Sequence, residues 1–234
     1  MPIRGIAVEL ADVMRSQHAC RYYQPDPVPE QVFYNAVEAA RFGPQGGNRQ
    51  PVRFLIVTDP AKKAQLAEWY RVPWKAYLEA ATVGQESIQA ESGDEKATTI
   101  TMSDPAKALA DADNFADHYE DHPAIVVVLA DLLDTHPTDT DLGRLSIVGG
   151  ASVYPIAQNF CLALRNQGVA TTLTTLLCMY EPQVKELLGI PDDLSTAAFI
   201  VAGYPAKPFP TKLLRLPVEE MGFLDSFDRP LTSG

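Results

Sequence analysis

An uninterrupted apolar run, AIVVVLA at Ala124–Ala130, limits the folds that are open to this chain. The run is too short to cross a bilayer as a helix, which takes about 20 residues, but it suits a strand buried in a protein core. The β-branched and aromatic stretches VRFLIVTD, VATTLTT and TAAFIVAGYP, at residues 52–59, 169–175 and 196–205, predict further strands. A β-sheet therefore lies at the centre of the predicted fold.

Helical patterns surround these strands, and their order shows no regular βα alternation. This order favours an α+β fold over a doubly wound sheet. The pattern over residues 142–167 is apolar on so much of its circumference that one sheet would not cover it, so we expect this helix at a subunit interface. Helices are predicted over residues 6–14, 29–41, 60–81, 142–167 and 181–190.

Two segments differ from the rest of the chain. Residues 82–105 are polar and lack periodicity, which is typical of a long lid-like loop. Residues 206–234 are rich in proline and are expected to form an extended C-terminal arm. We interpret residues 1–234 as a single domain with these two excursions.

Charge and cysteine content narrow the possible partners. The formal net charge of −11 would repel phosphate backbones, so we expect no nucleic-acid partner. Cys20, Cys161 and Cys178 are widely separated in apolar surroundings and are interpreted as reduced thiols. Charged residues interrupt the N-terminal segment, so we expect no export signal, no membrane partner and a cytoplasmic location.

The common catalytic and metal-binding signatures do not occur in this sequence. The turn GPQGGNRQ at residues 43–50 lacks the Gly-Lys-Ser/Thr ending of a P-loop, and no G-x-S-x-G elbow exists. His118 and His122 have the spacing of a metal half-site, but a solvated helix end is the simpler interpretation because no third ligand is implied. Asp131, Asp134, Asp139 and Asp141 do not match an EF-hand and are interpreted as solvated, so no metal site is predicted.

What remains is a set of hydrogen-bond donors and acceptors in separate segments. Each has a structural alternative: Asn48 closes a turn, Arg21 pairs with a surface carboxylate, and threonines favour strands. The set consists of Arg21, of Asn48 and Gln50, of Thr174 and Thr175, and of Lys212 and Arg215.

In sequence order, these segments resemble the FMN-dependent nitroreductase family, and more closely its mycobacterial-type NAD(P)H nitroreductases. The resemblance runs from about residue 13 to residue 220. The matching motifs are QHACRYY, PDPVP, GPQGGNRQPVRF, QNFCLALRNQGVATTLTT, LLGIP, VAGYP and LLRLPVEE. Gln17, His18 and Ala19 depart from the family's Arg-Arg-Ser pattern, and Gln45 stands where a serine is usual.

The resemblance implies a three-layer fold with a mainly antiparallel sheet, and a homodimer that binds FMN at the subunit interface. It assigns Arg21 to flavin N1 and O2, Asn48 and Gln50 to the pyrimidine edge, and the backbone at Thr174 and Thr175 to N5. His18 and Arg215 are assigned to the phosphate side, with the arm crossing to the partner subunit.

The implied activity is hydride transfer from NAD(P)H through FMN to a nitroaromatic, quinone or similar acceptor by a ping-pong mechanism, with no catalytic side chain. Two alternatives stay open: a flavoenzyme of the same fold that dehalogenates, dehydrogenates or fragments its flavin, and a flavin-binding protein with low turnover. Aromatic residues that precede the lid-like loop are candidates for stacking on a flat substrate, with plain helix packing as the alternative: Trp69, Tyr70, Trp74 and Tyr77.

Overall fold

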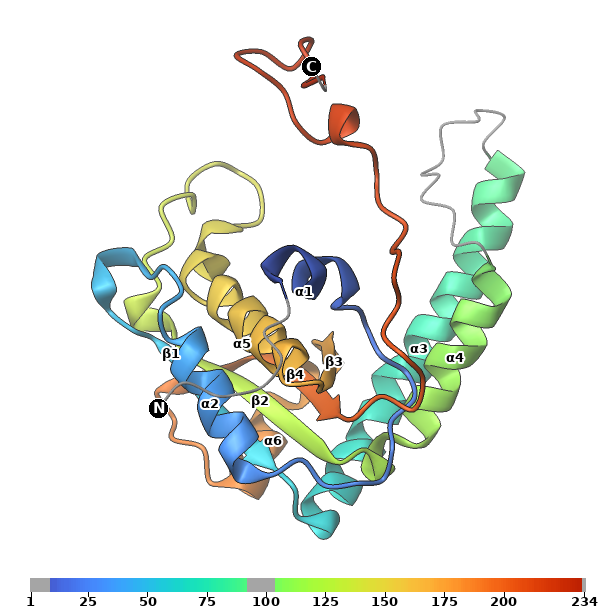
Figure 1. The fold of residues 1–234 in the computed structure, drawn as a ribbon, viewed down its shortest axis with the longest axis vertical. Helices are drawn as coiled ribbons and strands as arrows, with labels where there is room; N and C mark the ends of the chain where they lie inside the picture. The colour runs from blue at the N-terminus through green and yellow to red at the C-terminus, as the bar shows by residue number, and fades with distance from the viewer. Residues whose placement is uncertain (1–8, 92–103, 233–234) are drawn as a thin grey trace.

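The computed structural model describes residues 9–91 and 104–232, and an antiparallel sheet forms the centre of this part of the chain (Figure 1). The strand order is β1-β2-β4-β3, so β1 and β3 are the two edges. The four predicted strands are confirmed with bounds that differ by one or two residues: β1 Val52–Val57, β2 Ala124–Asp131, β3 Ala170–Thr174 and β4 Leu194–Gly203.

Alternate residues of β2 face two different hydrophobic clusters. Val126 and Val128 pack toward α2 (Glu30–Ala40) and α5 (Tyr154–Asn166), whereas Ile125 and Val127 pack toward α3 (Pro60–Glu91) and its neighbours. This two-residue period is that of a strand buried on both faces. The chain therefore has the predicted three-layer α+β fold, completed by α1 (Leu10–Ser16), α4 (Pro105–Asp117) and α6 (Glu181–Leu188).

The central pair of strands has a long antiparallel register. β2 pairs with β4 from Ala124 opposite Ala202 to Asp131 opposite Leu194, with a bulge between Val128 and Leu129. This central pair separates the edge strands β1 and β3. Neighbouring strands in a sheet lie about 4.8 Å apart.

The structure corrects the start of the lid-like loop predicted over residues 82–105. α3 continues to Glu91, and α4 begins at Pro105 with the carboxylate of Asp104 accepting a hydrogen bond from the backbone N–H of Lys107. Polar composition misled the prediction because a helix can continue through polar residues without an apolar stripe over its full length. The rest of the predicted loop, residues 92–103, lies outside the described residues.

The helix predicted over residues 142–167 is shorter than expected. Residues 142–147 are not helical, Val148–Ser152 forms a 3₁₀ turn, and α5 begins at Tyr154 with Pro155 in its first turn. Within the chain, α2 packs beside α5 on the same face of the sheet, and α1 also contacts α5. The apolar circumference that suggested a subunit interface is therefore largely buried by the protein's own helices.

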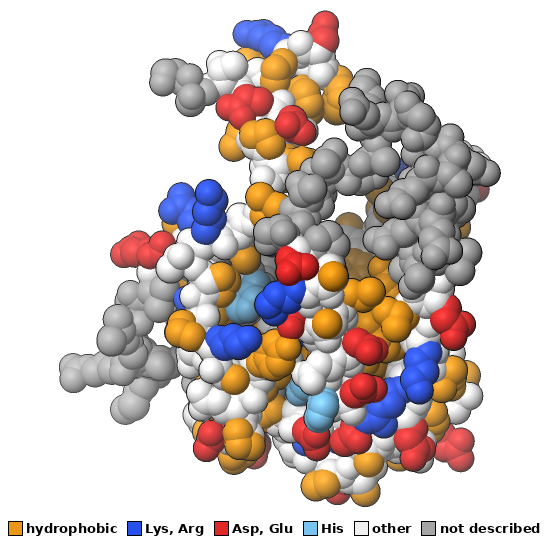
Figure 2. Space-filling view, turned by 90° about the vertical axis from the view of Figure 1, so that its right-hand side faces the viewer, with side chains coloured by type: hydrophobic (Ala, Val, Ile, Leu, Met, Phe, Trp, Pro, Cys, Tyr) orange, Lys and Arg blue, Asp and Glu red, His pale blue; other side chains and the backbone are white. Residues whose placement is uncertain are grey.

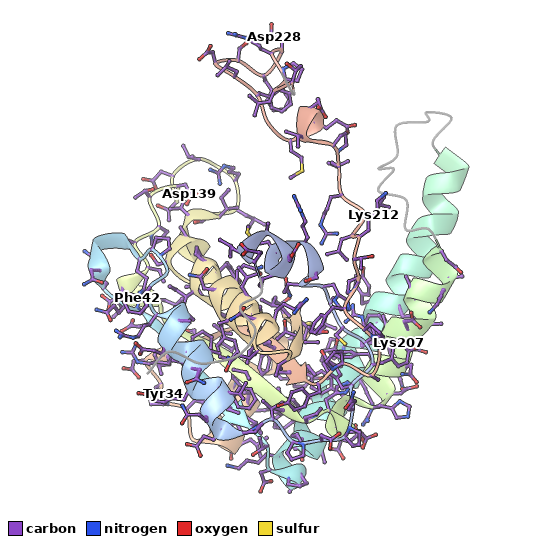
Figure 3. All side chains as sticks on the ribbon, viewed as in Figure 1. Tyr34, Phe42, Asp139, Lys207, Lys212 and Asp228 are labelled. Atoms are coloured by element: carbon purple, nitrogen blue, oxygen red, sulfur yellow. The ribbon has the colours of Figure 1, made fainter. Side chains whose placement is uncertain are left out.

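The C-terminal arm is bound to the body only at its start. The backbone N–H of Gln24 donates to the carbonyl of Tyr204, and that of Ala206 donates to the carbonyl of Tyr22. Lys207 still lies against the body, with its Nζ 4.3 Å from the centroid of the Tyr22 ring, whereas Lys212 lies on the part of the arm that has left it (Figure 3).

Gly203, at the end of β4, leaves no room for a side chain. A Cβ atom there would lie 2.8 Å from Pro123 Cγ and 2.9 Å from Tyr23 Cδ1. We therefore expect Gly203→Ala to lower the free energy of unfolding by about 1–3 kcal/mol through overpacking, measured by denaturant titration. Gly149→Ala is the matched control, because its Cβ would come no closer than 3.9 Å to Pro137; equal effects of the two substitutions would contradict this reading.

Candidate functional site

The free edge of β3 carries the N-terminal segment that contains His18 and Arg21. The backbone N–H of Cys20 donates to the carbonyl of Thr171 at 3.1 Å, and the hydroxyl of Thr172 donates to the carbonyl of Cys20. Thr171 and Thr172 are buried, so this pairing fixes the segment against the sheet. His18 and Arg21 thereby acquire defined positions beside β3.

Arg21 is half-buried without a charged partner. Its guanidinium carbon lies 5.0 Å from the centroid of the Phe115 ring, which belongs to α4 and is buried. Among the described residues, the Arg21 side chain has no carboxylate within ion-pair distance and no hydrogen-bond acceptor. A half-buried guanidinium normally finds acceptors for its five N–H donors, so this position suits an acceptor from a bound ligand.

His18 lies near two cations. Burial lowers the pKa of His18 most, and the charges of Arg165 and Arg21 lower it further, against a hydrogen bond to the Ser16 carbonyl that raises it. The Nδ1 atom of His18 lies 3.2 Å from that carbonyl oxygen. An anion held beside the ring would offset the positive charges of the two arginines and favour the protonated imidazole.

Thr174 and Thr175 end β3 close to Arg21. Burial raises the pKa of Tyr70, while the Thr174 side chain and the charge of Arg21 lower it, so both groups lie near the Tyr70 hydroxyl. Tyr70 stacks on Tyr119 with ring centroids 4.1 Å apart, which holds it in the core. Thr175 lines a cavity of about 840 Å³ that extends to Gly150 in the 3₁₀ turn before α5.

The glycine-rich turn has an unusual backbone. Gly47, Asn48 and Gln50 all have positive φ angles, of 60°, 53° and 56°. The backbone N–H of Gly46 donates to Ser152 Oγ at 3.0 Å, which fixes the turn to the start of α5. Positive φ in a residue such as glutamine costs energy and often marks a functional site, since the fold must hold it there.

Within one chain, the predicted site residues fall into separate groups. His18, Arg21, Thr174 and Thr175 lie at the β3 edge, whereas Asn48 and Gln50 are exposed on the turn that leads into the opposite edge, β1. Three strand spacings separate these edges, or about 14 Å. Arg215 is exposed on the free part of the arm, where its Nη1 donates to the carbonyl of Leu214.

The sequence patterns did not single out Arg165, Phe115 or Phe209 as part of this site. Arg165 lies in the last turn of α5, its Nε donates to Ser16 Oγ, and its guanidinium lies over the ring of Phe209 in the arm. The available signal was a lone cation in an otherwise apolar helical pattern. Phe115 carried no signal, because its contact with Arg21 exists only in the folded chain.

The predicted solvation of His122 and Asp139 is wrong. His122 is 6% exposed and stacks on Phe115 at 4.6 Å, whereas His118 is exposed as expected. Asp139 is 4% exposed and accepts hydrogen bonds from Ser146 Oγ, the backbone N–H of Ile147 and Arg144. These bonds, that from Ser146 foremost, lower the pKa of the carboxyl group to about 2.

Residues 9–91 and 104–232 contain neither a cluster of metal ligands nor a membrane-spanning helix. No group of three or more histidine, cysteine or acidic side chains in these ranges has the geometry of a metal site. No helix in the same ranges is long and apolar enough to span a membrane. Cys20, Cys161 and Cys178 are free thiols.

These observations define a class: a three-layer α+β protein with basic and hydroxyl groups gathered at one edge of its sheet. Comparison with known proteins gives the family. The family model described as Nitroreductase family matches residues 14–204. The chain therefore belongs to the nitroreductase family of oxidoreductases.

The similarity to individual known proteins extends over most of the chain. The NADH dehydrogenase of Thermus thermophilus is 26% identical over 211 residues, which cover 88% of this chain and 90% of that protein. The iodotyrosine deiodinase of Nematostella vectensis is 24% identical over 216 residues, 92% of this chain and 74% of that protein. The solved structure of the NADPH:FMN oxidoreductase from Vibrio harveyi, in complex with NAD⁺, matches with a TM-score of 0.62 at 18% identity, covering 95% and 79% of the two chains. That structural likeness confirms the nitroreductase fold.

Proposed function

We propose that this protein is an FMN-dependent oxidoreductase that transfers a hydride from NAD(P)H to a nitroaromatic, quinone or similar flat acceptor. When bound, FMN supplies the hydride chemistry, and donor and acceptor occupy the same cleft in turn. The observation that carries the proposal is the half-buried guanidinium of Arg21, which has no acceptor among the described residues.

The residues at the β3 edge fit the cofactor chemically. Arg21 offers a fixed positive charge for the electron-rich edge of a reduced flavin, and the Phe115 ring supports its guanidinium from behind. Thr174 and Thr175 offer backbone and hydroxyl donors, and Thr174 lies near the Tyr70 hydroxyl. His18 would lie on the side of the phosphate group. These residues bind and orient the cofactor, and no side chain is required as a catalytic acid or base.

We propose further that the complete site forms between two copies of the chain. Asn48 and Gln50 lie at the opposite sheet edge from Arg21, so both sets reach one flavin only if the turn comes from a partner. A two-fold axis would then create two equal clefts. The arm would bring Arg215 to the phosphate of an FMN held mainly by the neighbouring subunit.

Exposed apolar side chains support this assembly. Leu133, Leu145 and Phe227 are 87%, 90% and 85% exposed, a degree typical of surface that another protein covers. Hydrophobic side chains also gather at the outer end of the arm, at the top of Figure 2. In Figure 3 this end of the arm, marked by Asp228, stands away from the body of its own chain.

The aromatic residues of α3 divide into two groups. Tyr70 and Trp74 are buried, and the indole N–H of Trp74 donates to Asp113 at 2.8 Å, so plain helix packing accounts for both. Trp69 stacks on Tyr180 at 6.1 Å. Tyr77 is 57% exposed and remains the candidate for stacking on a flat substrate.

The test begins with the visible spectrum of the purified protein. We expect flavin absorbance, or its recovery when FMN is added to colourless protein. Steady-state NAD(P)H oxidation should then rise when a nitroaromatic or a quinone is supplied. Protein that gains no flavin absorbance in excess FMN would overturn the proposal.

Dehalogenation is the second candidate, supported by the similarity to the deiodinase over 92% of this chain. The two candidates differ in the bond that is broken during turnover. Chemically reduced protein should release iodide from iodotyrosine if dehalogenation is the reaction, and should instead consume a nitroaromatic or quinone if the first proposal holds. Comparing the two single-turnover rates decides between the candidates.

A further inference from the structure

A second half-buried guanidinium, that of Arg165, lies beside His18. Its Nε donates to Ser16 Oγ at 2.9 Å, and its guanidinium carbon lies 3.6 Å from the centroid of the Phe209 ring. Ser16 is itself buried and Phe209 is half-buried. Arg165 is therefore held on one side by a hydroxyl and on one face by an aromatic ring.

The remaining donors of Arg165 are uncommitted. In the part of the chain that the structure describes, its Nη atoms have no hydrogen-bond acceptor and no carboxylate within ion-pair distance. Asp12 acts on it only as a more distant charge. In a chain of net charge −11, Arg165 and Arg21 thus form a local positive cluster beside His18. Such a cluster is destabilised by mutual repulsion unless an anion offsets it.

We propose that Arg165 binds the terminal phosphate of FMN, together with His18. This inference rests on the proposed function and adds a residue to its site. Gln17, His18 and Ala19 provide no arginine or serine on this side, and α5 supplies the missing cation from a different segment. Guanidinium groups bind phosphate through paired N–H donors, and the Nη atoms of Arg165 remain for this purpose because its Nε is used by Ser16.

The position in α5 strengthens the requirement for a cation. Arg165 lies in the last turn of the helix, where the carbonyl groups create a partial negative charge. Without the guanidinium, this helix end would repel a phosphate dianion. Removing the positive charge should therefore weaken phosphate binding by more than the loss of hydrogen bonds alone.

The test compares FMN with riboflavin, which has the same ring system and no phosphate. Flavin-free full-length protein is titrated with each ligand, and binding is followed by quenching of flavin fluorescence. We expect Arg165→Gln to weaken FMN binding about 10- to 100-fold and to leave riboflavin binding unchanged. Arg165→Lys, which keeps the charge but loses the paired donors, should give a smaller loss for FMN alone.

Arg41→Gln is the matched control, because it removes one positive charge from an exposed ion pair with Glu38 outside the cluster. It should leave both affinities unchanged. If Arg165→Gln weakens the binding of FMN and of riboflavin equally, Arg165 has a structural role and the inference is overturned. The inference is also overturned if the ratio of the FMN affinity to the riboflavin affinity is the same in the variant as in the wild type. If Arg165→Gln does not fold, the ratio of the FMN affinity to the riboflavin affinity of Arg165→Lys tests the inference in its place. Wild-type protein that binds neither ligand overturns the proposed function itself, which separates the two failures.

Discussion

Mixing two flavin-deficient variants should restore about a quarter of the FMN sites. The variants are Arg21→Ala, at the β3 edge, and Asn48→Gly in the glycine-rich turn. The second substitution removes the side-chain amide and introduces glycine, which tolerates the φ of 53° at this position. In an equal mixture, half of the dimers contain one chain of each kind. Each mixed dimer has one cleft with both wild-type residues and one cleft with both substitutions, because the two residues come from different chains.

The measurement is FMN bound per chain, after the two variants are unfolded together and refolded at a flavin concentration that saturates only the wild-type site. Arg21→Ala mixed with Thr174→Val is the control: both residues lie at the β3 edge of one chain, so no intact cleft forms. Recovery in the control, or none in the first mixture, would show that one chain holds the whole site.

The free energy of unfolding should fall by up to about 3 kcal/mol between pH 7 and pH 4 because of His122. Burial lowers the pKa of this histidine to about 4 in the folded protein, whereas an unfolded chain binds the proton near pH 6.5. Between these two values the unfolded state holds more protons, so stability is lost as the pH decreases. Asp121 acts against this shift and Lys63 with it, but burial is the largest cause.

Denaturant titrations at several pH values, at one protein concentration, test this expectation. His122→Phe keeps a planar ring on Phe115 and cannot be protonated, so its stability should depend less on pH than that of the wild type. His118→Gln replaces an exposed histidine and serves as the control. Parallel pH profiles for the wild type and His122→Phe would contradict the buried neutral state of His122.

Local patterns predicted much of the fold because the sheet is built from strongly apolar or β-branched runs. The apolar run at Ala124–Ala130 predicted a strand buried in the core, and the order of the motifs indicated the family. Segment ends were less predictable: α3 extends to Glu91 through a polar stretch without helical periodicity, whereas Gly149 and Gly150 interrupt a helical pattern that looked continuous.

The site was predictable only where a motif marked it. Arg21 and Thr174 were predicted in this way, and in the structure both lie near one Tyr70 hydroxyl; their role in cofactor binding stays a prediction. Arg165 was not, since its approach to His18 depends on how α5 packs on α1. His122 and Asp139 show the same limit: nearby acidic residues suggested solvent, but tertiary contacts bury both side chains.

The pairing of the N-terminal segment with the last strands has a consequence for the order of folding. Backbone hydrogen bonds join Cys20 to Thr171, Gln24 to Tyr204, and Tyr22 to Ala206. A chain emerging from the ribosome can pair β1 with β2 early, but the segment that carries Arg21 finds its partners only after β3 and β4 have been synthesised. Contacts between residues so distant in sequence form slowly. The cofactor edge is therefore completed late in biosynthesis, and a chain stopped before Ala170 would hold the glycine-rich turn without it.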